Sequence, residues 1–371
     1  MERTGIAVVG GGIAGVSIAR ELAATRDVVL LEAETEMPRH STARSAATYV
    51  PGHGSGPFRT LITASGPRFA ALSDDWGVPL LSPRPVLWLA HDDPGEAALA
   101  ALLAERAGEP DAPQPLTGAE AAQRCPVLRD PRAAAWTAGS ADADAIALHA
   151  GYLKDLRRRG GRVLRGAPVT AVVRDGDGWR IDAGEHRILA GEVVDAAGAW
   201  TDRVAALAGV PPIGLVPHRR TIAACPAPDP SAIRGLPMVV DPAERFYFKP
   251  EPDTVLVSPG DETPVEPGDA RPEEIDVALA LERVGEATTL GLRSVRTAWA
   301  GLRSFVADRG PVAGAWPDHP GFWFFAGHGG SGIESAPAFA ALGAAVVTGA
   351  PVPGDVPLDR AVVSVTRLVR R

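Results

Sequence analysis

The sequence predicts an α/β protein in which a nucleotide-binding domain, built from discontinuous pieces, is interrupted by a β-rich domain. Three observations lead to this prediction. The chain opens with a buried strand, a glycine-rich turn, a helix and a second strand at 28–31. Between residues 217 and 297 short strand patterns dominate, with one helical pattern. After residue 305 the α/β pattern returns with a strand, a second glycine-rich turn and a helix.

The length of 371 residues is typical of two domains. Hydrophobic residues make up 46% and charged residues 22%, which excludes a disordered or collagen-like chain. A net charge of -8 disfavours nucleic acid and anionic membranes as partners. Two cysteines, Cys125 and Cys225, are too few for a disulfide framework or a zinc site and fit a reducing compartment. Without a bilayer-length apolar run or a signal peptide pattern, we expect a cytoplasmic protein with no integral membrane segment and no metal site.

The first half of the chain alternates strands and helices. The strand at 6–9 is a β-branched apolar run, which suits a sheet covered on both faces. Helical spacing follows over 16–25, and the polar stretch 40–56 lacks any period and predicts a loop. By the same criteria we expect helices at 58–76, 96–106, 118–124 and 147–159, and strands at 28–31, 84–90, 162–164, 169–174, 179–182 and 192–195.

The pattern changes beyond residue 217. Short strands are expected at 221–224, 238–241, 246–249 and 254–258, with a helix at 272–289, a strand at 322–326 and a helix at 333–347. The middle part therefore indicates a mostly antiparallel sheet with a helix packed on it. We assign residues 1–78, 141–216 and 298–371 to the nucleotide-binding domain and residues 79–140 and 217–297 to a substrate-binding domain.

The first glycine-rich turn, Gly10-x-Gly12-x-x-Gly15, lies between a strand and a helix, the context that a dinucleotide site requires. Gly10 permits the tight turn, Gly12 the approach of a pyrophosphate and Gly15 close packing of helix on strand. The helix N-terminus favours the phosphate charge. Glu32 ends the next strand, where an acid accepts hydrogen bonds from a ribose diol. This motif does not separate NAD from FAD.

The second glycine-rich turn, at 327–333, favours a flavin over NAD. Four of its residues are glycines, and the lack of side chains there lets the backbone approach a planar ring closely. The N-terminus of the following helix would stabilise the negative charge of a reduced flavin. FAD is therefore the predicted cofactor, and NAD the alternative.

These two turns, together with segments 40–47, 195–200 and 299–305, resemble the D-amino acid oxidase superfamily of FAD-dependent oxidoreductases. That superfamily includes glycine oxidase, sarcosine oxidase and D-amino acid dehydrogenases. The resemblance covers nearly the whole chain and is strongest with bacterial FAD-dependent D-arginine dehydrogenase, notably through 80–85 and 246–250. It implies a Rossmann-type FAD-binding domain, similar to that of glutathione reductase, with an interleaved β-rich α+β substrate domain.

The resemblance implies noncovalent FAD, because Cys125 and Cys225 lie outside the segment that matches the flavin-linking cysteine of sarcosine oxidases. Residues 41–47 are similar to the segment that wraps the pyrophosphate and the flavin ring, and Val169 to a position whose backbone contacts the adenine. The implied cofactor contacts are Gly10, Gly12, Ile13, Ala14, Gly15, Glu32, Ala33, His40, Ser41, Thr42, Arg44, Ser45, Ala46, Ala47, Val169, Ala197, Gly198, Trp200, Arg303, His328, Gly329, Gly330, Ser331, Gly332 and Ile333.

In this family an amine carbon loses a hydride to the flavin, and water hydrolyses the resulting imine to a keto acid and ammonia. The protein must hold the substrate carbon over the flavin. Arg303 and Arg220 are the expected carboxylate clamp, since a guanidinium binds a carboxylate bidentately, and Arg220 is favoured over Arg219. Tyr247 adds an O–H donor.

Three positions depart from D-arginine dehydrogenase. Val86 stands where that enzyme has a glutamate for the substrate guanidinium, Thr48 where it has an active-site histidine, and His53 where it has a lid tyrosine. We therefore expect a substrate with a neutral side chain. His53 and His328 are the candidate titrating groups, and a structural role in a loop is equally open for each. Thr48 is a candidate for a hydrogen bond to the substrate.

The electron acceptor, a quinone or O2, is open. Lys249 matches a structural lysine better than an oxygen-activating one, which favours a dehydrogenase. One alternative keeps the flavin but takes an N-substituted glycine, an imino acid or a hydrazino acid in a biosynthetic pathway. Another is a flavin-binding protein without turnover, which Arg303 and Tyr247 argue against.

Overall fold

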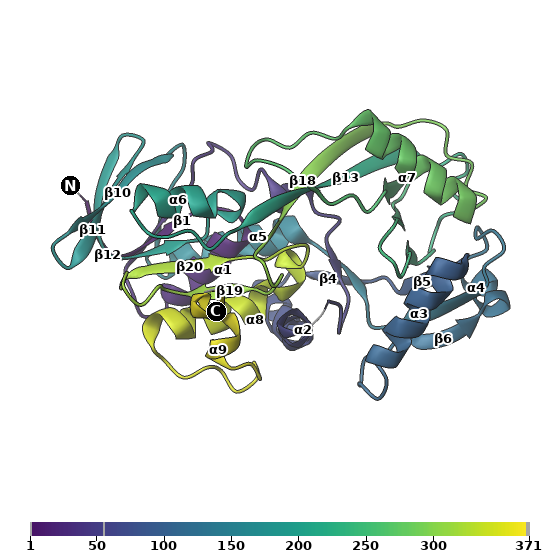
Figure 1. Cartoon of the computed structure of the whole chain (residues 1–371), viewed down its shortest axis with the longest axis horizontal. Helices are drawn as coiled ribbons and strands as arrows, with labels where there is room; N and C mark the ends of the chain where they lie inside the picture. The colour runs from purple at the N-terminus through teal and green to yellow at the C-terminus, as the bar shows by residue number, and fades with distance from the viewer. Residues whose placement is uncertain (1, 55, 369–371) are drawn as a thin grey trace.

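A parallel sheet carries one half of the molecule, at the left of Figure 1. The computed structural model describes residues 2–54 and 56–368, so residues 1, 55 and 369–371 of the proposed domain segments lie outside it. Five strands run parallel in the order β9-β2-β1-β12-β20. Their bounds, with the antiparallel edge strand β19, are β1 Glu2–Val9, β2 Val28–Leu31, β9 Arg162–Leu164, β12 His186–Asp195, β19 Val312–Gly314 and β20 Phe322–Ala326.

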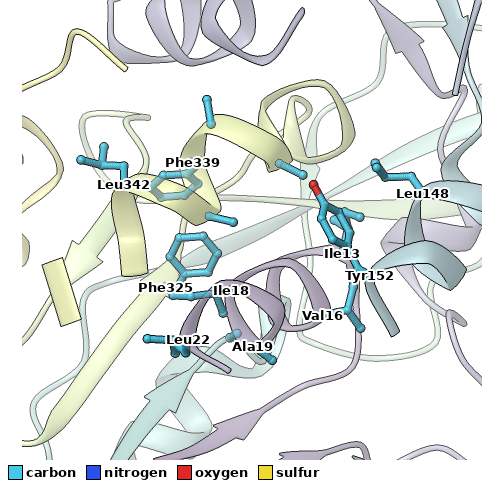
Figure 2. Packing of buried hydrophobic residues seen from close by; sticks show 14 of the residues in the cluster. Ile13, Val16, Ile18, Ala19, Leu22, Leu148, Tyr152, Phe325, Phe339 and Leu342 are labelled. Atoms are coloured by element: carbon cyan, nitrogen blue, oxygen red, sulfur yellow. The ribbon is translucent and has the colours of Figure 1, made fainter. Parts of the chain in front are cut away.

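Helices cover one face of this sheet, and they are α1 Ile13–Leu22, α2 Pro57–Trp76, α5 Ala145–Arg158 and α8 Gly332–Thr348. Apolar side chains of these helices form the largest core cluster. Helix α2 buries one stripe, as an amphipathic helix does, whereas α8 is buried on nearly every side. Figure 2 shows the side chains of α1 facing Phe325 of β20 and Phe339 of α8. The two phenyl rings lie 4.4 Å apart between centroids.

The opposite face of the parallel sheet is covered by a hairpin and a short helix. These elements are β10 Val169–Asp175, β11 Gly178–Ala183 and α6 Thr201–Leu207. The hairpin pairs antiparallel with the first half of β12, and its apolar side chains join a second core cluster. The remaining short elements are η1 Ser41–Arg44, η2 Gly198–Trp200, α9 Arg360–Val363 and η3 Val365–Leu368.

A nine-stranded sheet forms the other half of the molecule, in the order β17-β13-β16-β15-β14-β5-β7-β6, with β18 paired to β13. Every pair is antiparallel except β5 with β14. The strands are β5 Val86–Ala90, β6 Gln114–Thr117, β7 Ala133–Thr137, β13 Val216–Pro226, β14 Met238–Val240, β15 Tyr247–Pro250, β16 Thr254–Ser258, β17 Thr263–Pro264 and β18 Thr297–Phe305.

The two faces of this sheet have different partners. Helices α7 Glu274–Ala287 and α4 Gly118–Arg124 bury one face in a third core cluster. The other face carries a smaller cluster that includes Leu99 of α3 Asp93–Glu105. A three-stranded sheet of β3 Thr48–Tyr49, β4 Leu81–Pro83 and β8 Ala141–Ala143 adjoins it.

The expected fold class is confirmed, with differences at particular elements. Helix α1 begins at residue 13 rather than 16, because its first turn follows directly on the glycine-rich turn. Strands β6 and β7 were not predicted, since their alanines and prolines have low strand propensity. Strand β18 was not predicted either, and the proposed domain boundary at 297/298 falls at its start, although its partner is β13 of the other half. Among the described residues, none of the helices combines the length and apolar character needed to cross a bilayer.

Candidate functional site

One cavity of about 1000 Å³ is lined by both sheets. It extends from the carboxyl ends of β1 and β2, where ligands of open α/β sheets bind, to the face of the nine-stranded sheet that carries Val86, Arg220 and Tyr247. The structure places every residue of the predicted site in the lining of this cavity except Gly15. Residues as far apart in sequence as Gly10 and Ile333 are therefore gathered around one space.

The first glycine-rich turn is packed so tightly that two of its glycines have no room for a side chain. Gly10 has a φ of +106°, and a Cβ there would lie 2.5 Å from the carbonyl oxygen of Ala196. A Cβ on Gly15 would lie 1.7 Å from the carbonyl oxygen of Gly10. Gly15 therefore serves the contact between helix and strand, which explains why it does not line the cavity.

The same turn is held in place by side chains around it. Glu32 accepts hydrogen bonds from the backbone N–H of Gly11 at 2.6 Å and of Glu34 at 2.8 Å. The hydroxyl of Thr42 accepts one from Ile13 N–H at 3.0 Å. His149 Nε2 lies 2.7 Å from the Gly11 carbonyl oxygen, and burial lowers the pKa of His149, so its ring is neutral and can donate to that oxygen. Glu32 thus holds the turn, a role that its position in the sequence did not indicate.

The segment 40–47 bridges the two halves of the molecule. Ser41 Oγ donates to the carbonyl oxygen of Leu302 at 2.7 Å, and Arg44 Nη1 to that of Ala300 at 3.0 Å. Lys249 Nζ donates to the Ala46 carbonyl oxygen at 2.8 Å. The segment is therefore tied to β18 and β15, and apart from His40 and Arg44 its part of the cavity lining consists of small residues.

The second glycine-rich turn also lies against the cavity. Gly329 has a φ of +53°, and a Cβ there would lie 2.4 Å from the Phe305 ring. A Cβ on Gly330 would lie 2.9 Å from the guanidinium carbon of Arg303. Burial lowers the pKa of His328 to about 4, so this residue is neutral at physiological pH rather than titrating near neutrality.

The lining fits FAD on two independent grounds. The N-termini of α1 and α8 both reach the cavity, and neither N-cap residue makes a side-chain capping hydrogen bond. Apart from Ile13 N–H, which donates to Thr42, their first-turn N–H groups and positive dipole ends are available to anionic groups. In addition, His40 Nδ1 and His328 Nε2 are buried without any hydrogen-bond partner among the described residues, and both side chains line the cavity. Buried polar atoms are normally hydrogen-bonded, so both nitrogens fit a site that receives a polar ligand.

The opposite wall carries the predicted carboxylate clamp. Strands β13 and β18 pair in a register that sets Arg220 opposite Gly301 and His218 opposite Arg303, so both arginines lie on the same face. Among the described residues, none accepts a hydrogen bond from Arg303. Tyr247, from β15, also lines this wall, and burial raises the pKa of its hydroxyl, which stays protonated.

Arg220 is buried and partly neutralised. Its Nε donates to the carbonyl oxygen of Asp261 at 2.7 Å, and its Nη2 lies 3.2 Å from the Glu262 carboxylate. Burial, and then the charge of Arg303, lower the pKa of Arg220 to about 10. The adjacent Arg219 points to the other face of the sheet, where it pairs with acids of α7, in line with the preference for Arg220.

Several lining residues were missed by the sequence reasoning. Trp88 and Met238 form an apolar wall with Val86, and Thr48 Oγ1 lies 3.5 Å from Met238 Sδ. Glu334, in the first turn of α8, is 4% exposed, and its Oε1 lies 2.9 Å from His53 Nδ1. The position of Glu334 directly after the second glycine-rich turn was the sequence signal that could have identified it as a site residue.

Comparisons with known proteins agree with this geometry. Human dimethylglycine dehydrogenase is 25% identical over 265 residues, which cover 70% of this chain and 30% of that protein. The chain spans about a third of the length of the curated relatives that it matches first. Glycine oxidase from Geobacillus kaustophilus superposes with a TM-score of 0.85 at 24% identity, over 99% of both chains. Iminodiacetate oxidase from Chelativorans sp. BNC1 gives a TM-score of 0.78 at 25% identity, over 97% of this chain and 99% of that one.

A family profile described as "DAO: FAD dependent oxidoreductase" matches residues 5–346. That range contains both glycine-rich turns, the segment 40–47 and the arginine-bearing strands β13 and β18. The protein therefore belongs to the DAO family of FAD-dependent oxidoreductases.

Proposed function

We propose that the protein oxidises the C–N bond of a D-α-amino acid with a neutral side chain, and that the imino acid product hydrolyses to a 2-oxo acid and ammonia. Bound noncovalently, FAD supplies the two-electron acceptor that no amino-acid side chain provides. The residues of this chain bind the substrate, orient its Cα–H bond and exclude water from it.

The observation that carries this proposal is the unpartnered Arg303 in the cavity wall. Arginine side chains that are not exposed normally have a hydrogen-bond acceptor, and no described residue provides one here. A substrate carboxylate would satisfy two of its N–H groups at once. Tyr247 adds an O–H donor, and Arg220 a second cation, from the same face of the sheet.

The rest of the wall supports a neutral side chain. Val86, Trp88 and Met238 provide apolar surface from β5 and β14. Where D-arginine dehydrogenases have a glutamate, Val86 leaves no counter-charge for a substrate guanidinium. Glu244 also lines the cavity, but it is an exposed residue of the β14–β15 turn and hydrated, so it contributes little to binding a cation.

Anaerobic reduction of the bound flavin tests the proposal. D-amino acids with aliphatic or aromatic side chains should bleach the flavin absorbance, with D-Arg and D-Lys much slower. Steady-state kcat/KM across the same panel should give the same order. D-Arg as the best substrate would contradict the neutral preference, and a flavin that no amine reduces would contradict catalysis.

A second candidate is a secondary amine of the N-substituted glycine, imino acid or hydrazino acid class. It is favoured by the similarity to dimethylglycine dehydrogenase and iminodiacetate oxidase, and by the second cation, Arg220, which could bind a second carboxylate. Including iminodiacetate and sarcosine in the anaerobic panel separates the candidates by relative kcat/KM.

The surroundings of Lys249 bear on the electron acceptor. Lys249 makes ion pairs with Asp142 at 3.3 Å and Glu251 at 3.2 Å, which supports a structural role for this lysine and a dehydrogenase rather than an oxidase.

A further inference from the structure

A buried carboxylate and an imidazole form a hydrogen-bonded pair in the cavity wall. Glu334, in the first turn of α8, is 4% exposed, and its Oε1 lies 2.9 Å from His53 Nδ1. Its second oxygen, Oε2, accepts a hydrogen bond from the backbone N–H of Val50 at 3.2 Å. Both carboxylate oxygens are therefore committed to the segment that carries the histidine, and the ring orientation is set by α8.

The arrangement leaves the far side of the ring available. A neutral imidazole whose Nδ1–H donates to Glu334 carries its lone pair on Nε2. No described residue hydrogen-bonds this Nε2, and the His53 side chain, 38% exposed, lines the cavity. A carboxylate that orients an imidazole whose opposite nitrogen faces a reacting group is the geometry of a general base.

The reaction needs such a group. A free amino acid carries an ammonium group near neutral pH, and this group must lose a proton before its carbon can release a hydride. We propose that His53 Nε2 accepts that proton, with Glu334 as the positioning residue that orients the ring and stabilises the imidazolium. One N–H bond of the substrate breaks and one forms on His53, with no change in oxidation state. This inference rests on the proposed function and names the acid–base residues of the same site.

The charges around His53 agree with this assignment. Burial lowers the pKa of His53, but the Glu334 charge and hydrogen bond raise it by more, so the net shift is upward. Glu244, in the β14–β15 turn, adds to the increase, and Arg303 of β18 opposes it. Trp88 of β5, with its ring centroid 6.3 Å from that of His53, contributes no charge. The imidazole is thus more basic than in water, as the acceptor of an ammonium proton should be.

The test measures flavin reduction by a D-amino acid in anaerobic stopped flow, from acidic to alkaline pH, in the holoenzyme. For the wild type, the apparent second-order rate should rise with pH as His53 loses its proton. In Glu334→Gln this rise should move to lower pH. The control Glu244→Gln removes a nearby charge without a hydrogen bond to His53 and should shift the rise less.

The variant His53→Asn should lower the rate at neutral pH by about 100-fold. Its rate should recover at alkaline pH, where the substrate deprotonates by itself. NMR titration of the histidine side chains, with His53 assigned from the His53→Asn spectrum, should show a lower pKa for His53 in Glu334→Gln than in the wild type.

Each outcome decides a separate question. Reduction that stays efficient in His53→Asn at neutral pH, or a rise that does not move in Glu334→Gln, would overturn the proton-acceptor role and leave the proposed function standing. An unchanged His53 pKa in Glu334→Gln would overturn the pairing itself. A wild-type enzyme that no amine reduces at any pH would contradict the proposed function instead.

Discussion

Arg220 and Arg303 lie on one face of the β13–β18 pair, but only Arg220 is satisfied by the protein. Arg220 donates to the Asp261 carbonyl oxygen and approaches Glu262, whereas Arg303 has no acceptor among the described residues. The two guanidinium groups therefore have different roles. Arg303 is available to a ligand, and Arg220 adds positive charge to a site that a carboxylate can enter.

Replacing Arg303 tests the clamp directly. Arg303→Ala should lower kcat/KM by about 100-fold, since it removes a charged partner from a desolvated carboxylate. Thermal unfolding should change little, because Arg303 makes no hydrogen bond within the described protein. A variant with normal kcat/KM would show that the carboxylate binds elsewhere.

Two adjacent arginines provide a matched comparison. Arg220→Lys removes the forked geometry inside the cavity and should lower kcat/KM by about tenfold. Arg219→Lys makes the same change on the other face, where Arg219 pairs with α7, and should leave kcat/KM within about twofold. Equal effects of the two changes would refute the assignment of Arg220 to the site. Steady-state kinetics with the best D-amino acid gives the measurement.

A methyl group at residue 330 should displace the clamp without unfolding the turn. The added Cβ would lie 2.9 Å from the guanidinium carbon of Arg303, and a flexible side chain yields more easily than backbone. Gly330→Ala should therefore raise KM by about tenfold with little change in thermal stability. Gly354→Ala, which has no neighbour within 4 Å, is the control. A large loss of stability with unchanged KM would argue against the contact.

The preference for neutral side chains should depend on residue 86. Val86→Glu places a carboxylate in the cavity wall, which should raise kcat/KM for D-Arg relative to D-Leu by about tenfold. Val86→Gln has nearly the same shape without the charge and controls for the burial of a polar group. If both variants gave the same ratio, the side chain of the substrate would not contact this wall.

Stability should depend on Arg245, which lies outside the cavity lining. Arg245 binds Asp92 with both Nη atoms, at 2.7 and 2.8 Å, and its Nε lies 3.1 Å from Asp241 Oδ2. The Asp241 side chain is completely buried, so Arg245→Ala would leave an uncompensated charge and should lower the free energy of unfolding by about 3 kcal/mol. Arg296→Ala, which breaks an exposed pair with Asp253, should cost under about 0.5 kcal/mol. Urea unfolding followed by circular dichroism compares the two variants.

The sequence predicted the nucleotide-binding half best, because its signals are local. A β-branched run, a glycine-rich turn and an acid occur within about thirty residues, and β2, β9 and β20 fall where expected. Strands β6 and β7 gave no such signal, since their stability comes from pairing rather than from residue preference. The Glu334–His53 contact joins positions 281 residues apart, and only the folded chain brings them together.

The proposed substrate-binding wall consists of alternate residues of a sheet whose other face belongs to the core. Val86, Trp88 and Tyr247 belong to the cavity side, while Leu87 and Phe248 belong to the cluster behind. Substitutions on the cavity side could therefore accumulate while the residues of the core side, and the two glycine-rich turns, stay the same. This arrangement allows substrate specificity to change by substitution with little effect on folding. Among homologues, we therefore expect the greatest divergence at the cavity-facing positions of β5, β14 and β15.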